Sequence, residues 1–550
     1  MSNKLKVLSS AAAAIAIALL ISGCTKSTKQ SSQVSGQKTG GKLAVYLSEP
    51  AYIDPYNAQE TEGIEVVANV FDGLVDFDPK TSEIRPAVAE RWGANKDSTV
   101  WTFYLKKGTK FHNGREVTAE DFKYAWERIA NPKTNPPSEI SYHLSAIKGY
   151  KEMQDGSAKE LSGVNAKDKY TLEVTLEYPF ADFIYVVGHP ALAPVPKEEV
   201  EKGPKKFSEM PIGNGPFKMA EPWKHNQYIR LKRFDGYYGR KANLDEVDFK
   251  IFKDEQTAWL EFQAGKIDFT KSIPDGQIKA AIAKYGRSPD GYESYPGKQV
   301  LLGAESAVYY LNANNKNEFL KNPDVRRAIS LAIDRRAIVD TIYEGTRKPA
   351  TGIVPPGVVG FRQNASKYCA YDKEEAKKLL AKAGFPDGKG LPVFKLSFNT
   401  GAGHEKVMEL VQASLKEIGV QTELQGMEWA KLLDFRQKGE HELSRDGWIF
   451  DYPIIDNMLY PLFDSDNIGK DNTSYYSNPE VDKLIMEARK ELDEKKRVGK
   501  YQAAEQLILD DAAVIPLNFY AHRGVAQKWI TGLVYSPLGI VDYSSVSVEK

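Results

Sequence analysis

The chain contains 550 residues, with 74 Lys and Arg against 74 Asp and Glu, so its formal net charge is zero. This length exceeds what one hydrophobic core usually supports and predicts two or three lobes. The balanced charge, without a marked cluster of Lys and Arg, argues against nucleic acid as a partner. Aromatic residues make up 11% of the chain, which exceeds the needs of a core and predicts that some rings line a ligand cavity.

The N-terminus has the pattern of an export signal. Lys4 and Lys6 precede an apolar run that is too short to span a bilayer stably. The run ends Leu-Ile-Ser-Gly-Cys24, which matches the lipobox of bacterial lipoproteins, in which the cysteine is acylated and becomes the mature N-terminus. We therefore predict a lipoprotein signal peptide over 1–23, a flexible Ser-, Thr- and Lys-rich linker over 24–41, and a water-soluble body at the extracytoplasmic face of the cell membrane.

The first half of the body contains strand patterns and one clear helix. Thr118 and Asp121 form a capping box that begins a helix over 118–130. The glycines of 212–217 lack the spacing of a phosphate loop and predict a tight turn. Alternation of apolar and polar residues predicts strands over 42–47, 100–105 and 170–176.

The second half is richer in helices. Asp324 is predicted to cap a helix whose apolar face runs to Ile333, in a segment ended by Gly345. Further helices are predicted from Asp372 to Gly384 and along the apolar stripe 407–419, followed by a strand over 420–424. This rhythm of helices and strands predicts a mixed α/β lobe.

The stretch 443–453 is the most informative for function. It places Arg445 and Asp451 on either side of a run that includes Trp448 and Phe450. The aromatic run draws both charges toward a partly dry site, where each needs an opposite charge. A zwitterionic peptide offers both signs, but internal ion pairs on a half-buried strand would serve equally well, and this stretch does not decide between them.

Signs of a hydrolase are weak. His404-Glu405 and His441-Glu442 begin like a zinc-protease motif but lack the second histidine. No Gly-x-Ser-x-Gly elbow is present. Because acylation would consume Cys24, Cys369 is left unpaired and is expected to be an inert thiol. We therefore predict a binding protein without cofactor or metal, and keep a surface peptide hydrolase as the alternative from another class.

Several runs resemble the extracellular solute-binding proteins of family 5, the oligopeptide- and dipeptide-binding lipoproteins of ABC importers. The resemblance covers nearly all of 42–550. The runs that carry it are Ala87-Val-Ala-Glu-Arg-Trp92, Trp101-Thr-Phe-Tyr-Leu-Lys-Lys-Gly108, Lys110-Phe-His-Asn-Gly114, Thr118-Ala-Glu-Asp-Phe122, Asn322-Pro-Asp-Val-Arg-Arg-Ala-Ile329 and Ala513-Val-Ile-Pro-Leu517.

The resemblance implies an α/β, periplasmic-binding-protein-like fold of type II, cluster C. Two lobes hinged by two crossovers would enclose the ligand, and an extra lobe would lie beside the first. The implied lobes are lobe I, with residues 42–62, 206–300 and 521–550; the extra lobe II, with residues 63–205; and lobe III, with residues 301–520.

The resemblance also implies roles in ligand binding. Asp451 would take a peptide's amino group, and Arg445, His404 and Arg436 would form the cationic set that meets its carboxylate. Trp429 matches an aromatic residue of the cleft. The other implied contacts are Glu49, which faces the peptide backbone from lobe I, and Trp448 and Tyr452 beside Asp451.

The implied function is that of a monomeric receptor that captures oligopeptides and delivers them to the permease and ATPase subunits of an importer. The same fold also carries receptors for dipeptides, sugars and metal chelates, which remain alternatives. Peptide length and side-chain preference are not readable from the sequence.

Overall fold

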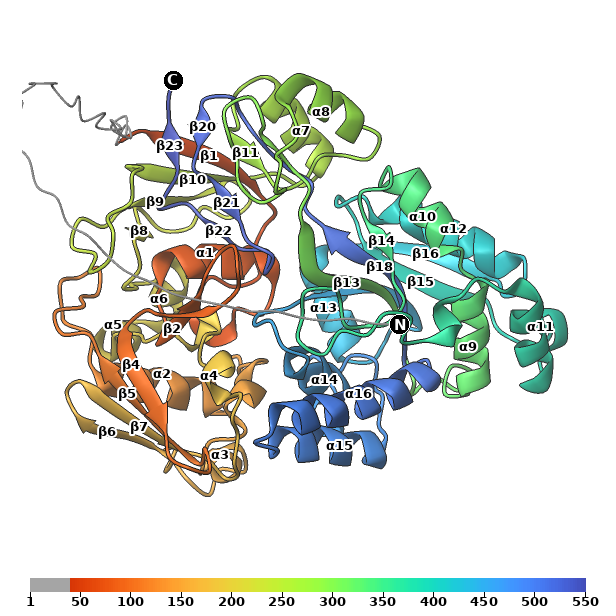
Figure 1. The fold of residues 1–550 in the computed structure, drawn as a ribbon, viewed down its shortest axis with the longest axis horizontal. Coiled ribbons are helices and arrows are strands. Elements are labelled where there is room, and N and C mark those ends of the chain that lie inside the picture. The colour runs from red at the N-terminus through yellow and green to blue at the C-terminus, as the bar shows by residue number, and fades with distance from the viewer. Residues whose placement is uncertain (1–39) are drawn as a thin grey trace, which may run out of the picture. The chain divides into compact units, whose positions relative to one another are not determined.

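The computed structural model describes residues 40–550, which lie within one compact unit, Lys38–Lys550. The predicted signal peptide, Cys24 and most of the predicted linker lie outside these residues. Three main sheets organise the described chain (Figure 1). Within residues 40–550, no helix is long and apolar enough to cross a bilayer.

A seven-stranded sheet gathers segments from both ends of the chain. The predicted first strand is confirmed as β1, which lies parallel to β10 and β11. In sheet order the strands are β12 (Val300–Leu301), β19 (Gly524–Ala526), β11 (Phe269–Thr270), β1 (Lys42–Leu47), β10 (Glu246–Ile251), β9 (Tyr228–Arg233) and β8 (Phe217–Met219). Further elements of this part are α7 (Glu255–Gln263), α8 (Ile278–Tyr285), β20 (Ile530–Thr531), β21 (Val534–Tyr535), β22 (Val541–Asp542) and β23 (Ser547–Val548).

A four-stranded antiparallel sheet forms from the segment between β1 and β8. The predicted strand over 100–105 is confirmed as β5, and that over 170–176 is confirmed as β7. The predicted capping box of Thr118 and Asp121 begins α2 (Ala119–Ala130), which contacts β6 and β7. The other elements are α1 (Thr61–Val70), β2 (Val75–Phe77), β3 (Ile84–Pro86), β4 (Ala89–Ala94), β5 (Val100–Leu105), α3 (Tyr150–Gln154), β6 (Val164–Asp168), β7 (Thr171–Thr175), α4 (Phe183–Val186), α5 (Lys197–Lys202) and α6 (Pro204–Glu209).

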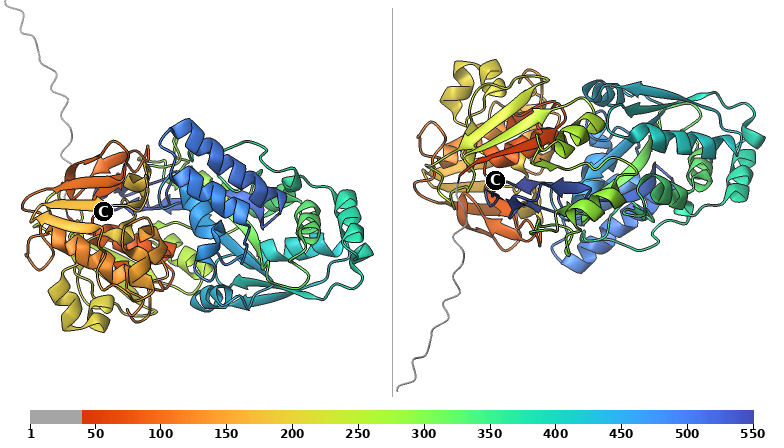
Figure 2. Two further views of the ribbon diagram at one scale, coloured as in Figure 1. Left: turned by 90° about the horizontal axis from the view of Figure 1, so that it is seen from below. Right: turned by 90° about the horizontal axis from the view of Figure 1, so that it is seen from above.

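A six-stranded mixed sheet forms the third part, which Figure 2 shows in green to blue. Its order is β14 (Lys348–Pro349), β18 (Val514–Ala521), β13 (Ala304–Ala313), β17 (Leu443–Ile449), β15 (Phe394–Asn399) and β16 (Thr422–Met427). Its helices are α9 (Pro323–Ala332), α10 (Arg335–Ile342), α11 (Lys373–Lys382), α12 (His404–Lys416), α13 (Trp429–Gln437), α14 (Asp456–Phe463), α15 (Pro479–Arg489) and α16 (Glu494–Asp510).

We propose that the seven-, four- and six-stranded sheets mark lobes I, II and III, and we use these names below. The predicted boundaries at 62/63, 205/206, 300/301 and 520/521 fall inside α1, α6, β12 and β18. The chain passes between the seven- and six-stranded sheets twice, from β12 to β13 and from β18 to β19. Buried Glu305 and His522 contact each other across the two crossovers, which fixes these segments side by side.

The helix predicted from Asp324 begins and ends differently in the structure. Asn322 caps α9, with Pro323 in the first turn, because its side chain accepts from the Asp324 backbone N–H at 2.9 Å. The segment then breaks after Ala332, and Asp334 caps the separate helix α10. The predicted cap Asp372 of α11 is confirmed. Helix α12 ends earlier than predicted, at Lys416 with Glu417 as its C-cap, and Gly419 with positive φ lies two residues beyond that cap. The strand predicted over 420–424 is shifted to Thr422–Met427.

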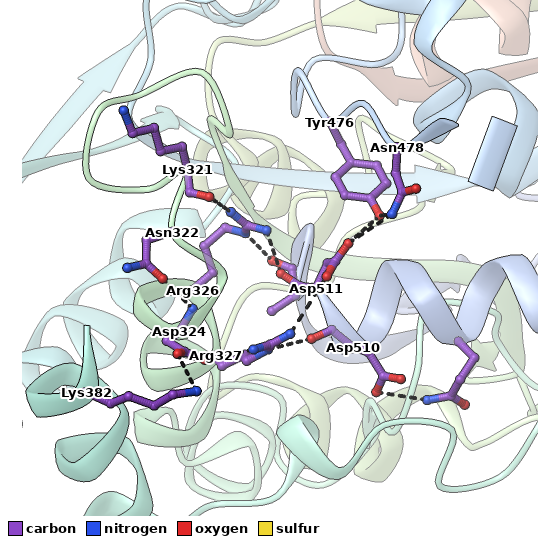
Figure 3. Close-up of polar contacts among 12 residues, drawn as sticks. Lys321, Asn322, Asp324, Arg326, Arg327, Lys382, Tyr476, Asn478, Asp510 and Asp511 are labelled. Carbon is purple, nitrogen blue, oxygen red and sulfur yellow. Dashed lines mark hydrogen bonds and ion pairs between the residues drawn. The ribbon is translucent and has the colours of Figure 1, made fainter. Parts of the chain in front are cut away.

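The Asn322–Ile329 run is a structural joint rather than a ligand contact. Arg326 is 3% exposed and donates to the carbonyls of Leu320, Lys321, Asp511 and Ala512. Figure 3 shows Arg326 between Lys321 and Asp511. These carbonyls belong to the turn before α9 and to the end of α16, so one guanidinium ties the two helices together.

Candidate ligand-binding site

A cavity of about 500 Å³ lies between the sheets. Glu49 and Glu62 line it from the N-terminal segment, Pro190 from lobe II, and every residue from Arg445 to Asp451 from lobe III. The stretch singled out in the sequence therefore forms part of the wall of this cavity.

Strand β17 positions this wall. It pairs with β13 in the middle of the six-stranded sheet, with Arg445 opposite Leu311 and Trp448 opposite Val308. Gly447 allows close packing, because a Cβ atom there would lie 2.7 Å from the Tyr520 hydroxyl and that side chain would have to shift. The central strand thus carries Arg445, and Asp451 lies two residues beyond its end, so the two residues are six positions or at most roughly 20 Å apart.

Asp451 is held as a carboxylate. Its side chain is 18% exposed and lies 3.3 Å from His189 Nε2, and Asn457 Nδ2 donates to Oδ2 at 3.1 Å. Burial alone would raise the pKa of Asp451, but the neighbouring His189 and His143 and the bond from Asn457 outweigh it, so the pKa lies below its ordinary value.

His143, His189 and Asp451 place three potential metal-ligand atoms within 4.8 Å of one another. The tautomer of His189 disfavours a metal here. Its Nδ1 accepts from the Ala191 N–H at 3.0 Å, so the neutral ring carries its proton on Nε2, which faces Asp451. A metal-ligating histidine normally donates from its second nitrogen instead. The cluster is therefore better suited to holding the Asp451 carboxylate through a proton donor than to binding a metal ion.

Arg445 has no carboxylate partner among the described residues. Within residues 40–550, its side chain donates one hydrogen bond, from Nη2 to the Tyr520 hydroxyl at 3.4 Å, and its Nε is buried without a partner. The guanidinium lies 5.6 Å from the ring centroid of Trp429, which also lines the cavity. Arg445 is therefore a buried cation available to an anionic ligand group.

Arg436 is predicted to belong to the cationic set that meets the ligand's carboxylate, but in the structure its charge has a partner. It forms an ion pair with Asp446, and both side chains are almost fully buried. Asp446 is the next residue after Arg445 on β17, a pairing that sequence reasoning missed. Because its charge is already matched, Arg436 supports the wall and has little capacity for a ligand carboxylate.

His404 begins α12 beside this wall. Its Nδ1 lies 3.2 Å from the Tyr309 hydroxyl. Burial lowers its pKa well below the ordinary value, and the positive charges of Arg445, Arg347 and Arg523 lower it further. His404 is thus a neutral polar group in a cationic surrounding, not a further positive charge.

The remaining predicted contacts divide into two groups. Trp448 and Glu49 line the cavity; Trp448 Nε1 donates to Asn457 Oδ1 at 3.1 Å, and Glu49 accepts from the Asn226 N–H at 2.9 Å. Tyr452 does not line it. This residue is 1% exposed and its hydroxyl donates to Asp456, so its predicted contact with ligand is corrected to a supporting position behind the wall.

Arg347 and Tyr520 are cavity residues that sequence reasoning missed. Arg347 follows α10 and Tyr520 lies on β18, and the Arg347 guanidinium is 4.0 Å from the centroid of the Tyr520 ring. No local motif marks either residue. Only the pairing of β14 with β18 brings their segments together.

The fold and the cavity define a class: a binding protein whose cavity lies between sheets that two crossovers connect. The chain belongs to the bacterial extracellular solute-binding proteins, family 5, whose model matches residues 83–470. The α/β fold class predicted from the sequence is confirmed.

The dipeptide-binding protein DppE of Bacillus subtilis is 30% identical over 545 residues, with 96% of each chain covered. The murein tripeptide-binding protein MppA of Escherichia coli has a solved structure that matches with a TM-score of 0.83 and 30% identity, covering 92% of this chain and 98% of that one. A structure described as the unliganded open form of MppA matches with a TM-score of only 0.65, at 29% identity and with 94% and 99% coverage. The sheets here are therefore arranged less like the open form than like the other MppA structure.

Proposed function

We propose that this protein is the peptide-binding receptor of an ABC importer. The observation that carries the proposal is the presence, in one cavity, of a carboxylate at Asp451 and a guanidinium without a carboxylate partner at Arg445. A peptide's ammonium and carboxylate supply the two missing charges. The relatives named as dipeptide- and tripeptide-binding proteins support the same ligand class.

In this proposal Asp451 binds the amino end and Arg445 the carboxyl end of the peptide, with Trp429, Trp448 and Glu49 beside the chain between them. The two arginines differ in role: Arg445 contacts the ligand, whereas Arg436 neutralises Asp446. The six-residue separation of Arg445 and Asp451 in the chain is compatible with short peptides.

Another small solute in the same fold, such as a sugar or a metal chelate, is the second candidate. A sugar offers no charge to Arg445, so it leaves a buried cation unmatched. Two measurements test peptide binding against it: mass spectrometry of the ligand released by denaturing the purified protein, and calorimetry with a peptide mixture. Release of a sugar, with no heat from peptides, would contradict the proposal.

We also propose that bound peptides are not cut. Burial raises the pKa of Cys369, so its thiolate is disfavoured, and His404 faces Tyr309 rather than a nucleophile. Peptides incubated with the protein and examined by mass spectrometry should be recovered intact. Accumulating fragments would favour the hydrolase alternative.

Finally, we propose that the protein is a monomer tethered at the extracytoplasmic face of the cell membrane through lipid on Cys24. The lipobox supports this, and the polar linker allows the body to reach a permease. A Cys24→Ala variant should lose incorporation of labelled lipid and leave the membrane fraction. Unchanged labelling would contradict the anchor.

A further inference from the structure

Four arginines line the cavity, and two of them lack a carboxylate partner. Arg436 is paired with Asp446, and Arg523 with Asp275 at 3.0 Å. By contrast, among residues 40–550 no carboxylate lies within 4.0 Å of a charged nitrogen of the other two, which are Arg347 and Arg445.

Arg347 and Arg445 each use only a few of their hydrogen-bond donors. Arg347 donates to the amide oxygen of Asn518 at 3.1 Å, and Arg445 donates to the hydroxyl of Tyr520 at 3.4 Å. Nε is buried without a hydrogen-bond partner in all four cavity arginines, so the missing carboxylate is what distinguishes Arg347 and Arg445. Since a guanidinium carries five N–H donors, each has most of its capacity for an anion still available.

The two guanidiniums face the same part of the cavity. Tyr520 lies between them, because its ring packs 4.0 Å from Arg347 and its hydroxyl accepts from Arg445. His404 is close enough to both that their charges lower its pKa. They therefore form one dicationic subsite rather than two separate sites.

The nearby acidic side chains are engaged elsewhere. Glu305 contacts His522, and the Ser272 hydroxyl donates to Glu255 at 2.8 Å. Burial raises the pKa of Glu255, although the charges of Arg523 and Arg347 and the bond from Ser272 act in the opposite direction. The walls of the cavity therefore do not neutralise both guanidiniums.

A simple peptide has a single terminal carboxylate, which matches one guanidinium and leaves the second buried without a counter-charge. We propose that this receptor selects peptides with two carboxylates at the carboxyl end, meaning peptides that end in an acidic residue. This inference rests on the proposed function and names its substrate class. Arginine suits the task because its planar fork binds a carboxylate through two parallel hydrogen bonds.

The test compares Ala-Ala-Glu with Ala-Ala-Gln, which have nearly the same shape and differ by one charge. Calorimetry on the wild-type protein should give roughly tenfold to hundredfold tighter binding of Ala-Ala-Glu, the range expected for hydrogen bonds between charged groups. In Arg347→Gln the two peptides should bind alike, with Ala-Ala-Gln retaining most of its wild-type affinity.

Arg91→Gln is the matched control, because it also removes one positive charge. The Arg91 side chain is exposed and stacked on Tyr104, and Arg91 does not line the cavity. This variant should leave the discrimination unchanged. Equal wild-type affinity for the two peptides would overturn the inference while peptide binding stands. The inference would also be overturned if binding of a neutral tripeptide depended on Arg445 and binding of a neutral tetrapeptide depended on Arg347. The two arginines would then bind the carboxyl ends of peptides of different lengths. No binding of any peptide would overturn the proposed function itself.

Discussion

In the proposed site a single side chain, that of Asp451, binds the ligand's amino end. Within a closed cavity, removal of one partner of an ion pair leaves the other buried and unpaired, at a cost of roughly 3–5 kcal/mol. Asp451→Asn should therefore weaken peptide binding by about a hundredfold to several thousandfold, with little change in the melting temperature of the ligand-free protein. Calorimetry and thermal unfolding measure the two quantities.

A double cycle with the ligand identifies the partner of Asp451. Acetylation of the peptide's amino end should weaken wild-type binding by a similar factor and add little further loss in Asp451→Asn, because both changes remove the same contact. Full additivity of the two losses would place the amino group elsewhere.

His112 should make the fold sensitive to acid. Its Nδ1 accepts from the Gly213 N–H and its Nε2 faces the Gly215 carbonyl, so both ring nitrogens are used by the neutral form. Burial lowers its pKa to about 3, well below the value of about 6.5 expected in the unfolded chain. The unfolded state therefore binds the proton first as the pH falls, and stability that is present above pH 6.5 is lost below it.

Between pH 6.5 and 4.5 this loss should amount to about 1–3 kcal/mol for His112 alone. Urea unfolding at several pH values measures it. A His112→Gln variant should show a shallower decline than the wild-type protein, whatever its stability at pH 7.5. The same decline in both proteins would show that His112 does not contribute.

The role of a site residue could be predicted from the sequence where its partners lie nearby in the chain, and not where they lie far away. Arg445 and Asp451 share one short stretch, and their need for a dry, charged surrounding was readable there. The ion pair between Arg436 and Asp446 was not, because α13 must fold back against β17 to form it. Arg347 was missed for the same reason: its place in the cavity depends on the pairing of β14 with β18.

At the scale of elements, local signals located most segments and failed where tertiary packing decided. Capping chemistry placed α2 and α11 correctly. It did not distinguish Asn322 from Asp324 as the cap of α9, since both residues are good acceptors near the start of one apolar face. The break before α10 was also missed, because Asp334 begins a new helix without a glycine or proline to mark it.

Arg326 should stabilise lobe III by connecting the ends of α9 and α16. Arg326→Met would leave four carbonyls at the ends of α9 and α16 without their donor, so we expect a loss of roughly 3–5 kcal/mol in the free energy of unfolding. Peptide affinity should change little, because Arg326 does not line the cavity.

Arg327→Met is the matched control for this loss. Arg327 is 20% exposed, pairs with Asp324 at 2.7 Å and donates to one carbonyl, that of Asp510 (Figure 3). Because water can replace part of these contacts, its loss should be about 1 kcal/mol. Equal losses in the two variants, measured by urea unfolding, would show that the four carbonyls find other donors.

At the scale of the whole described unit, lobes II and III touch through specific polar contacts beside the cavity. Tyr460 donates to Ser145 at 2.7 Å, and Tyr142 donates to Asp471. Asp182, just before α4, pairs with Arg497 of α16 at 2.8 Å, with side chains 8% and 10% exposed. Hinge opening would separate these residues and return them to water, so the contacts favour the closed arrangement and couple closure to ligand retention.

The pair of Asp182 and Arg497 offers a test of this coupling that does not touch the ligand. Burial raises the pKa of Asp182 to about 6 in spite of Arg497, so the pair lies in a dry surrounding. Asp182→Asn leaves Arg497 without a counter-charge in the closed form only, a penalty of about 1.5–3 kcal/mol on closure. Peptide affinity should fall roughly tenfold to hundredfold, and X-ray scattering at subsaturating peptide should give a larger radius of gyration.

Two further variants test whether the loss of peptide affinity in Asp182→Asn comes from impaired closure or from lower stability. Asp182→Asn combined with Arg497→Gln removes both charges and should recover most of the affinity, because no buried charge is then left unpaired. Glu505→Gln breaks a comparable pair, that with Arg362 at 2.8 Å, inside lobe III. It should lower the melting temperature without weakening peptide binding. If Asp182→Asn and Glu505→Gln weakened binding equally, the effect would come from general destabilisation, and the contact between lobes II and III would have no part in retaining the ligand.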